Sequence, residues 1–371
     1  MPLRVLIIPD KFKGTLTAQA AADAIAAGWS GARPRDHIEI LPMSDGGDGF
    51  GAVLGELTGA RERCTPTVDA AHRPLRALWR LDEKRKTAII DSAGIIGLAM
   101  LPAKKFHPFQ LDSFGVGKVM RAAAKAGAVK GIVGLGGSAT NDGGFGLARA
   151  LGWTFFNKNK EELTQWPRLL ELAEARPPKR PLPWKLTVAV DVNNPLLGAK
   201  GCSRIFGPQK GLQPRDIERA EKCLDQLASV LKDQHGIRCG KTHGAGAAGG
   251  LGFGLLAFAG ARLDSGFDVF ARCAKLDDRI RRADLVITGE GRMDIQTYMG
   301  KGVGQIARRC LALGVPCLAL AGIVQQPARA RRWFVKTRAL TDIAGPDRAQ
   351  SHAGRYLQQL AAETAETFTE S

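Results

Sequence analysis

This sequence has few aromatic residues and lacks the common nucleotide-binding and hydrolytic motifs. Only 6% of its residues are Phe, Trp or Tyr, which leaves few rings on which the bases of a nucleic acid could stack. No G-x-x-x-x-G-K-S/T run occurs, because the nearest segment, 236–242, is one residue short and follows a predicted helix instead of a strand. H-E-x-x-H and G-x-S-x-G are also missing. These absences argue against a P-loop kinase, a zinc peptidase and an α/β-hydrolase.

Paired cysteines and long apolar runs are missing as well. The seven cysteines form no C-x-x-C pair and no cluster with any of the six histidines, a distribution typical of reduced thiols. The apolar run near the N-terminus is too short for the core of a signal peptide, and no other run approaches the length of a membrane span. We therefore expect a cytoplasmic protein without a membrane partner.

Basic residues are abundant but scattered. The net charge is +17, and the densest basic segments, 176–185, 279–282 and 329–338, are not interleaved with aromatic residues. A nucleic-acid-binding protein would gather this charge on one face, which the sequence does not indicate. We expect a solvated basic surface that attracts small anionic substrates, and no nucleic-acid partner.

Short apolar runs alternate with helical patterns along the chain. Seven runs rich in β-branched residues predict strands covered on both faces, at 4–8, 38–41, 88–90, 129–133, 186–190, 285–288 and 317–321. Apolar residues at three- and four-residue spacing predict helices at 18–28, 145–151, 216–234, 301–313 and 355–367. This alternation predicts an α/β fold with largely parallel sheets.

The two ends of the chain carry similar strand–helix units, which indicates a discontinuous domain. We expect residues 1–66 and 284–371 to form a Rossmann-like or flavodoxin-like domain. A second α/β domain, 67–283, is then inserted into it and carries the glycine-rich loops.

Glycine is enriched and gathered in runs, and 134–144 is the most informative of them. It follows a predicted strand, leads into a predicted helix, and contains hydroxyl side chains and the carboxylate of Asp142. Glycines let a backbone approach a phosphate closely, and free N–H groups at a helix start attract anions. Ser138 and Thr140 add hydroxyl donors, and Asp142 is a candidate metal ligand or proton acceptor. The segment therefore predicts a phosphate-binding loop.

Polar segments follow five of the predicted strands, at 10–14, 44–49, 134–144, 191–198 and 289–294. Because open parallel sheets bind ligands at the carboxyl ends of their strands, these segments are expected to converge on one cleft between the domains. The carboxylates of Asp45, Asp191 and Asp294 are expected to face that cleft.

The run 244–249 matches G-x-G-x-x-G, the pattern of a nicotinamide-dependent oxidoreductase, and Asp264 follows it. The residues before it, 241–243, do not form a predicted strand, and no histidine is placed for hydride transfer. We expect the run 244–254 to bring its backbone close to a ligand or to another loop.

Glycine-rich loops, carboxylates and a few basic residues are the parts that phosphoryl transfer requires. At these residues the chain resembles the bacterial glycerate kinase family, a two-domain α/β type unrelated to P-loop kinases. The resemblance runs in order over about residues 3–325, through the segments 9–16 (PDKFKGTL), 45–49 (DGGDG), 136–144 (GGSATNDGG), 191–198 (DVNNPLLG), 206–211 (FGPQKG), 244–252 (GAGAAGGLG) and 287–294 (ITGEGRMD).

The resemblance implies a phosphotransferase that uses ATP and Mg²⁺ to phosphorylate D-glycerate, with the 2-hydroxyl favoured. A kinase of the same fold that acts on another small hydroxy acid is the alternative. Glycerate and ATP are the expected partners, and the chain is expected to be a monomer or a homodimer.

Residue roles follow from the chemistry of the side chains. Asp191 is expected to orient or deprotonate the acceptor hydroxyl, with Lys13 and Asp45 as further catalytic candidates. Phosphates are expected to contact Gly136, Gly137, Ser138, Ala139, Thr140, Asn141 and Asp142. Arg292, Asp294 and Asp10 are expected to bind the acceptor, Arg292 through its carboxylate. Asp191 and Glu290 are the candidate metal ligands.

Overall fold

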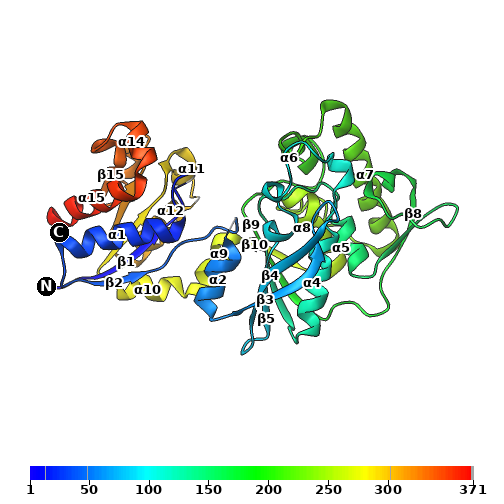
Figure 1. The fold of residues 1–371 in the computed structure, drawn as a ribbon, viewed down its shortest axis with the longest axis horizontal. Helices are drawn as coiled ribbons and strands as arrows, with labels where there is room; N and C mark the ends of the chain where they lie inside the picture. The colour runs from blue at the N-terminus through cyan, green and yellow to red at the C-terminus, as the bar shows by residue number, and fades with distance from the viewer. Residues whose placement is uncertain (13, 48, 301, 369–371) are drawn as a thin grey trace. The chain divides into compact units, whose positions relative to one another are not determined.

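The computed structural model describes residues 1–12, 14–47, 49–300 and 302–368. The chain forms two compact units, which we call unit 1 (Met1–Ser44 with Ala271–Ser371) and unit 2 (Asp45–Phe270). Unit 1 is drawn in blue and in yellow to red in Figure 1, because it is built from both ends of the chain.

Unit 1 contains a five-stranded parallel sheet in the order β15-β13-β11-β1-β2. Its two central strands, β1 (Arg4–Pro9) and β11 (Leu285–Gly289), pair in register from Val5 opposite Leu285 to Pro9 opposite Gly289. In chain order the strands occupy the positions 2-1-3-4-5, which is the flavodoxin-like arrangement. The chain reverses its direction of progress between β1 and β11, and ligands of such sheets bind at that point.

Helices α1 (Ala18–Ala32) and α15 (Ala353–Glu366) lie side by side on unit 1 (Figure 1). Thr17 caps α1 by accepting a hydrogen bond from the N–H of Ala20. The remaining elements of unit 1 are β2 (His37–Ile40), α10 (Leu276–Arg282), β12 (Arg292–Met293), α11 (Ile295–Tyr298), α12 (Val303–Leu313), β13 (Cys317–Ala321), β14 (Ile323–Val324), α13 (Pro327–Ala330), β15 (Lys336–Ala339), η4 (Leu340–Asp342) and α14 (Pro346–Ser351). Helix α9 (Gly266–Ala274) spans the boundary between the units.

Unit 2 contains a six-stranded sheet in the order β10-β9-β6-β5-β4-β3. The four strands β5 (Thr87–Asp91), β6 (Lys130–Gly134), β9 (Lys185–Val190) and β10 (Arg262–Ser265) are parallel. Strands β3 (Arg61–Val68) and β4 (Pro74–Asp82) extend the sheet as an antiparallel hairpin. The carboxyl ends of the four parallel strands therefore meet at one edge of the sheet.

The helices of unit 2 enclose a core that includes Val133, Phe145 and Leu224, all fully buried. The other elements of the unit are α2 (Phe50–Thr58), α3 (Ala93–Ile96), η1 (Leu98–Met100), η2 (Pro108–Gln110), α4 (Phe114–Lys125), α5 (Phe145–Ala150), β7 (Thr154–Asn157), η3 (Trp166–Glu171), β8 (Leu172–Arg176), α6 (Cys202–Lys210), α7 (Pro214–His235) and α8 (Ala247–Ala259). Within α8, residues 248–250 have left-handed backbone angles and interrupt the helix.

The structure confirms the predicted α/β fold with mostly parallel sheets. Each of the seven predicted strands is present, within a residue or two of its expected bounds. The helix predicted over 301–313 is α12, and its first predicted residue, Lys301, lies outside the described residues. The compact units change at 44/45 and 270/271. The predicted limits of the domains as folding units, 66/67 and 283/284, stay a prediction.

Among the described residues, no helix combines the length and the apolar character that crossing a membrane requires.

Candidate functional site

The glycine-rich segment 134–144 joins the end of β6 to the start of α5. The N–H of Leu135 donates to the carbonyl of Ala189, which ties the segment to the neighbouring strand β9. Gly136 is half-buried and Gly137 is exposed, whereas the residues after them are buried. Gly137 has a φ of +53°, a backbone conformation that favours glycine. The exposed part of the loop is therefore Gly136 and Gly137, at the start of the tight turn 136–140 and at the carboxyl edge of the sheet.

Backbone hydrogen bonds from the segment after β5 hold this turn from one side. The N–H of Leu98 donates to the carbonyl of Gly137 at 2.7 Å, and the N–H of Ala139 donates to the carbonyl of Ile96 at 2.8 Å. Because these bonds involve main-chain atoms on both sides of Ser138, they fix the path of the turn.

Asp142 is fully buried and accepts hydrogen bonds from residues at the starts of α4 and α5. Its carboxylate accepts hydrogen bonds from the N–H and the hydroxyl of Ser113 and from the N–H groups of Gly144 and Gly146. Burial raises the pKa of this carboxyl, and the charge of Asp112 raises it further. The sequence predicts a nucleotide contact for Asp142, and the structure places its carboxylate inside the loop, where it orders the start of α5.

Lys210, the last residue of α6, lies beneath the turn. Its ammonium donates to the hydroxyl oxygen of Ser138 at 3.0 Å and to the carbonyl of Thr140 at 2.7 Å. This lysine lies in the FGPQKG segment, and the sequence predicts no role for it. A lysine at a helix C-terminus is normally exposed, so only its tertiary contacts distinguish it.

The second glycine run, 244–254, packs against the same loop. A Cβ atom at Gly249 would overlap the carbonyl oxygen of Thr140 and would lie 2.7 Å from its carbonyl carbon. The N–H of Gly143 donates to the carbonyl of Gly249 at 3.1 Å. In the part of the chain that the structure describes, no strand leads directly into this run, and its contacts with Thr140 and Gly143 confirm a close backbone approach to another loop.

Asp45 and Asp191 lie at the same edge of the unit 2 sheet. Asp191 is exposed and is the first residue after β9. A Cβ atom at Gly46 would lie 3.6 Å from the carbonyl carbon of Ala189 and 3.1 Å from the Cα of Gly266. The segment after Asp45 therefore packs on the ends of β9 and β10, although it follows β2 of unit 1 in the sequence.

Two buried hydroxyls beside the turn have no hydrogen-bond partner among the described residues. They are the Oγ of Ser92, which follows β5, and the Oγ1 of Thr140. Buried hydroxyls are normally paired, and a phosphate supplies only acceptors for them. The donor set of unit 2 therefore fits a phosphate group.

Asp10 and Glu290 lie together at the point in unit 1 where the strand order reverses. Asp10 follows β1 and Glu290 follows β11, and the N–H of Asp10 donates to the carbonyl of Gly289 at 2.8 Å. A Cβ atom at Gly302 would lie 3.6 Å from Oδ2 of Asp10 and 3.9 Å from Oε2 of Glu290. The structure thus brings a predicted acceptor-binding residue and a predicted metal ligand to one place.

Asp294 and Arg292 lie on the segment that follows Glu290. Asp294 caps α11 by accepting a hydrogen bond from the N–H of Gln296 at 2.8 Å. The hydroxyl of Thr297, in the first turn of this helix, donates to Oε1 of Glu290 at 2.6 Å. This helix start therefore orients the carboxylate of Glu290, while Arg292 is exposed on β12.

The predicted site residues divide between the two units. Asp45, Asp191 and the loop 136–142 belong to unit 2, whereas Asp10, Glu290, Arg292 and Asp294 belong to unit 1. Lys13 lies outside the described residues. The meeting of the two sets in one cleft, and the roles of the residues, stay predictions.

A magnesium ion fits the carboxylates of unit 1. The described residues contain no cluster of three or more His, Cys, Asp or Glu side chains suited to a metal. Mg²⁺ does not need such a cluster, because it is usually held by one or two carboxylates together with substrate phosphates. Asp10 and Glu290 supply two.

Replacing Gly137 by valine is expected to weaken ATP binding and turnover while the thermal melt stays cooperative. A Val side chain resists the φ of +53° and would obstruct the approach of a phosphate to the turn. Gly127→Val is the matched control, because Gly127 is exposed with a φ of +92° and a Cβ there meets nothing within 4 Å. Normal nucleotide binding by the Gly137 variant in calorimetry would mean that the run is only a turn.

Comparison with known proteins identifies the family. The model of the glycerate kinase family matches residues 5–369. A glycerate kinase of Bacillus subtilis is 33% identical over 370 residues, covering 98% of this chain and 97% of that protein. A glycerate 2-kinase of Escherichia coli is 36% identical over 327 residues, covering 86% of this chain and 85% of that protein.

A solved structure supports the same assignment. A Salmonella typhimurium protein described as a glycerate kinase 2 superposes with a TM-score of 0.85 and 31% identity, covering 99% of this chain and 98% of that one. The family match extends beyond residue 325, where the resemblance seen in the sequence motifs ends. It confirms the resemblance that those motifs indicate. The chain belongs to the glycerate kinase family.

Proposed function

We propose that this protein transfers the terminal phosphoryl group of ATP to D-glycerate, with the 2-hydroxyl as the favoured acceptor. Membership of the family confirms the predicted enzyme class, a phosphotransferase with an alcohol acceptor. The relative from Escherichia coli, named glycerate 2-kinase, supports the choice of hydroxyl. The observation that carries the proposal is the turn 136–140, which has a buried ammonium beneath it and Asp191 at the end of the neighbouring strand.

In unit 2 the turn is the proposed phosphate site. Gly136 and Gly137 offer an accessible backbone, and Ser138 and Thr140 supply hydroxyls, while Asn141 and Asp142 support the turn from inside. Asn141 does so by donating from Nδ2 to the hydroxyl oxygen of Ser203 at 2.9 Å. A rigid turn holds its donors in place before the phosphate arrives, so little reorganisation is needed during transfer.

Asp191 is the proposed residue that orients or deprotonates the acceptor hydroxyl. It directly follows a strand that pairs on both sides, so its backbone position is fixed. Its side chain is exposed, as a group that must meet a substrate requires. Asp45, on the adjoining segment, is the second carboxylate available at this edge.

In unit 1 we propose that Glu290, with Asp10 beside it, holds Mg²⁺. The ion would neutralise charge on the phosphates during transfer. Thr297 keeps the carboxylate of Glu290 oriented by its 2.6 Å hydrogen bond. Arg292, exposed on the next segment, is the proposed partner of the glycerate carboxylate, which a guanidinium can bind through two hydrogen bonds. We further propose that the protein acts as a monomer or a homodimer.

Release of ADP from Mg-ATP is expected to accelerate strongly when D-glycerate is added. A coupled assay measures the release, and phosphorus NMR reads which hydroxyl carries the product phosphate. L-glycerate and a panel of short hydroxy acids are tested in the same assay. A better acceptor among them would favour the alternative, a kinase of the same fold that acts on another small hydroxy acid. ADP release by folded protein no faster with any of these acceptors than with water alone would refute the proposed reaction.

A further inference from the structure

Lys210 is a buried cation to which the proposed function assigns no role. The residue is 7% exposed, and its ammonium makes two hydrogen bonds, both to uncharged oxygens of Ser138 and Thr140. No carboxylate among the described residues lies within 4.0 Å of it in an ion pair. Burial of a charge without a counter-ion is costly, and proteins seldom retain one without a use for it.

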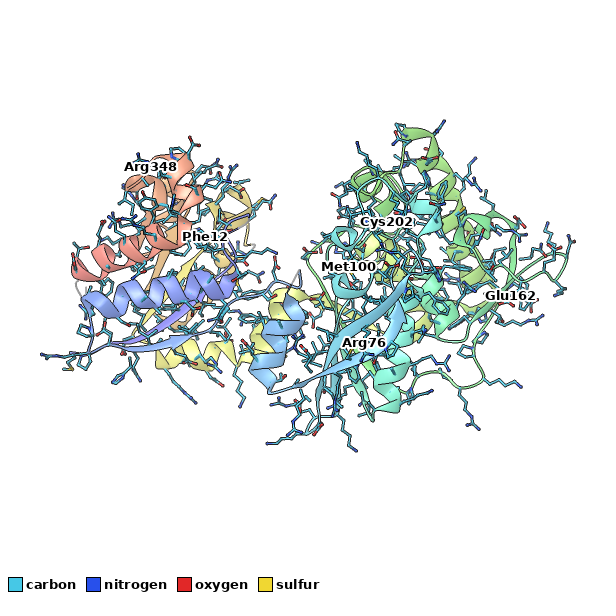
Figure 2. The ribbon with its side chains drawn as sticks, viewed as in Figure 1. Phe12, Arg76, Met100, Glu162, Cys202 and Arg348 are labelled. Carbon is cyan, nitrogen blue, oxygen red and sulfur yellow. The ribbon has the colours of Figure 1, made fainter. Side chains whose placement is uncertain are left out.

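Among the described residues, no ionisable group around Lys210 forms an ion pair with its ammonium. Cys202, at the other end of α6 (Figure 2), is fully buried, and burial raises the pKa of its thiol to about 12, so it stays uncharged. Asp142 raises the pKa of Lys210 through its charge but forms no ion pair with it, because its carboxylate oxygens accept hydrogen bonds from Ser113, Gly144 and Gly146.

Glu221 of α7, whose charge acts on Cys202, interacts with other groups through Oε2. Its carboxylate accepts from the N–H of Gly198 at 2.9 Å and lies 3.8 Å from the guanidinium of Arg204. Lys210 therefore has no ion-pair partner among the described residues, and its two hydrogen bonds go to the turn 136–140.

We propose that Lys210 is a positioning residue that shapes the turn 136–140 from beneath and supplies the positive charge against which a phosphate group of the nucleotide binds on the outer side. The inference rests on the proposed function of the turn as the phosphate site. Its ammonium acts through Ser138 and Thr140, because both of its hydrogen bonds end on residues of the turn.

The proposal predicts that phosphate binding and the protonation of Lys210 are linked. Burial lowers the pKa of Lys210 to about 8 in the free protein, so the ammonium begins to lose its proton within a readily tested range. A bound anion stabilises the charged form and raises this pKa. Affinity is therefore highest below about pH 8 and falls as pH rises above it, by up to tenfold per pH unit until the pKa of the complex is reached.

The test measures the binding of inorganic tripolyphosphate by calorimetry between pH 6.5 and pH 9.5. Wild type is compared with Lys210→Met, which keeps a long side chain but removes the charge, and with Lys222→Met, an exposed lysine on α7, as the matched control. D-glycerate is titrated as a second probe, to distinguish a phosphate from a carboxylate.

Lys210→Met is expected to bind tripolyphosphate at least tenfold more weakly at pH 7 and to lose the fall in affinity above pH 8. Lys222→Met is expected to behave as wild type, and glycerate binding is expected to be unchanged. Identical pH profiles of Lys210→Met and Lys222→Met would overturn the proposal. A loss confined to glycerate would overturn it too.

A second variant keeps the inference testable where Lys210→Met does not fold. Ser138→Ala removes one acceptor of the ammonium, which lowers the pKa of Lys210 further and is expected to move the fall in affinity to lower pH. An unmoved profile contradicts the proposal. These measurements use binding alone, so they are independent of the glycerate assay. Tripolyphosphate binding that depends on the protonation of Lys210, without phosphorylation of glycerate, would refute the proposed function and leave the role of Lys210 intact.

Discussion

Replacing Asp191 by asparagine is expected to lower kcat for glycerate phosphorylation by a factor on the order of 10² or more, the range of a positioned acid–base group. Asparagine has nearly the same shape, so the change removes charge and basicity and leaves the end of β9 in place. The KM for ATP is expected to stay close to that of wild type, because the phosphates are assigned to the turn 136–140.

Asp233→Asn, at an exposed position of α7, is the control with the same change in net charge. Steady-state kinetics of both variants at saturating ATP separates a local effect from a general one. A loss in kcat of less than about threefold for Asp191→Asn would remove this residue from the catalytic candidates. An equal loss in both variants would do the same.

Strands β1, β5, β9, β11 and β13 could be predicted from the sequence because each is mostly buried and appears as an apolar run. Strands β3, β4, β10 and β15 carry no such run, and the sequence does not predict them. Strand β3 is mostly exposed and contains arginine and glutamate, so it carries no apolar run. An edge strand gains its stability from pairing with one neighbour, and that neighbour is not visible in the local sequence.

The candidate site was predicted in its parts, because glycines, hydroxyls and carboxylates after strands are a local signal. The unit to which each part belongs is set by tertiary contacts. Asp45 follows β2 of unit 1 in the sequence, yet the next residue, Gly46, packs against Ala189 and Gly266 of unit 2. Sequence proximity to a strand therefore did not identify the sheet on which this segment packs.

Lys210 and Asp142 both show that the local sequence does not reveal whether a polar side chain is buried. A lysine at the end of a helix is usually solvated, and only the burial of Lys210 beneath the turn marks it as special. An aspartate in a glycine-rich loop indicates a ligand site, yet Asp142 is fully buried and ties the loop to the start of α4 and α5. Burial depends on how α4, α6 and the loop pack together, which no local pattern reveals.

Replacing Gly249 by alanine is expected to give the largest loss of stability among simple substitutions at the site. Gly249 has a φ of +69°, which costs an alanine about 1–2 kcal/mol. Its Cβ would also overlap the carbonyl of Thr140, and relieving a contact with backbone in a packed interior costs about 1–3 kcal/mol more. Since Thr140 accepts the hydrogen bond of Lys210, any shift that relieves the overlap displaces the turn and is expected to weaken phosphate binding too.

Gly260→Ala separates the two costs. Gly260 closes the same helix with a φ of +60°, but nothing lies within 4 Å of a Cβ atom there, so this variant pays only for the backbone conformation. The two are compared by urea unfolding followed by tryptophan fluorescence, since Trp79, Trp153, Trp166 and Trp184 all lie in unit 2. A free energy of unfolding that falls equally in both variants would show that the approach of Gly249 to Thr140 is not tight. A larger loss in Gly249→Ala, with weaker tripolyphosphate binding at temperatures where the protein is still folded, is the result that a close contact between the two glycine-rich segments requires.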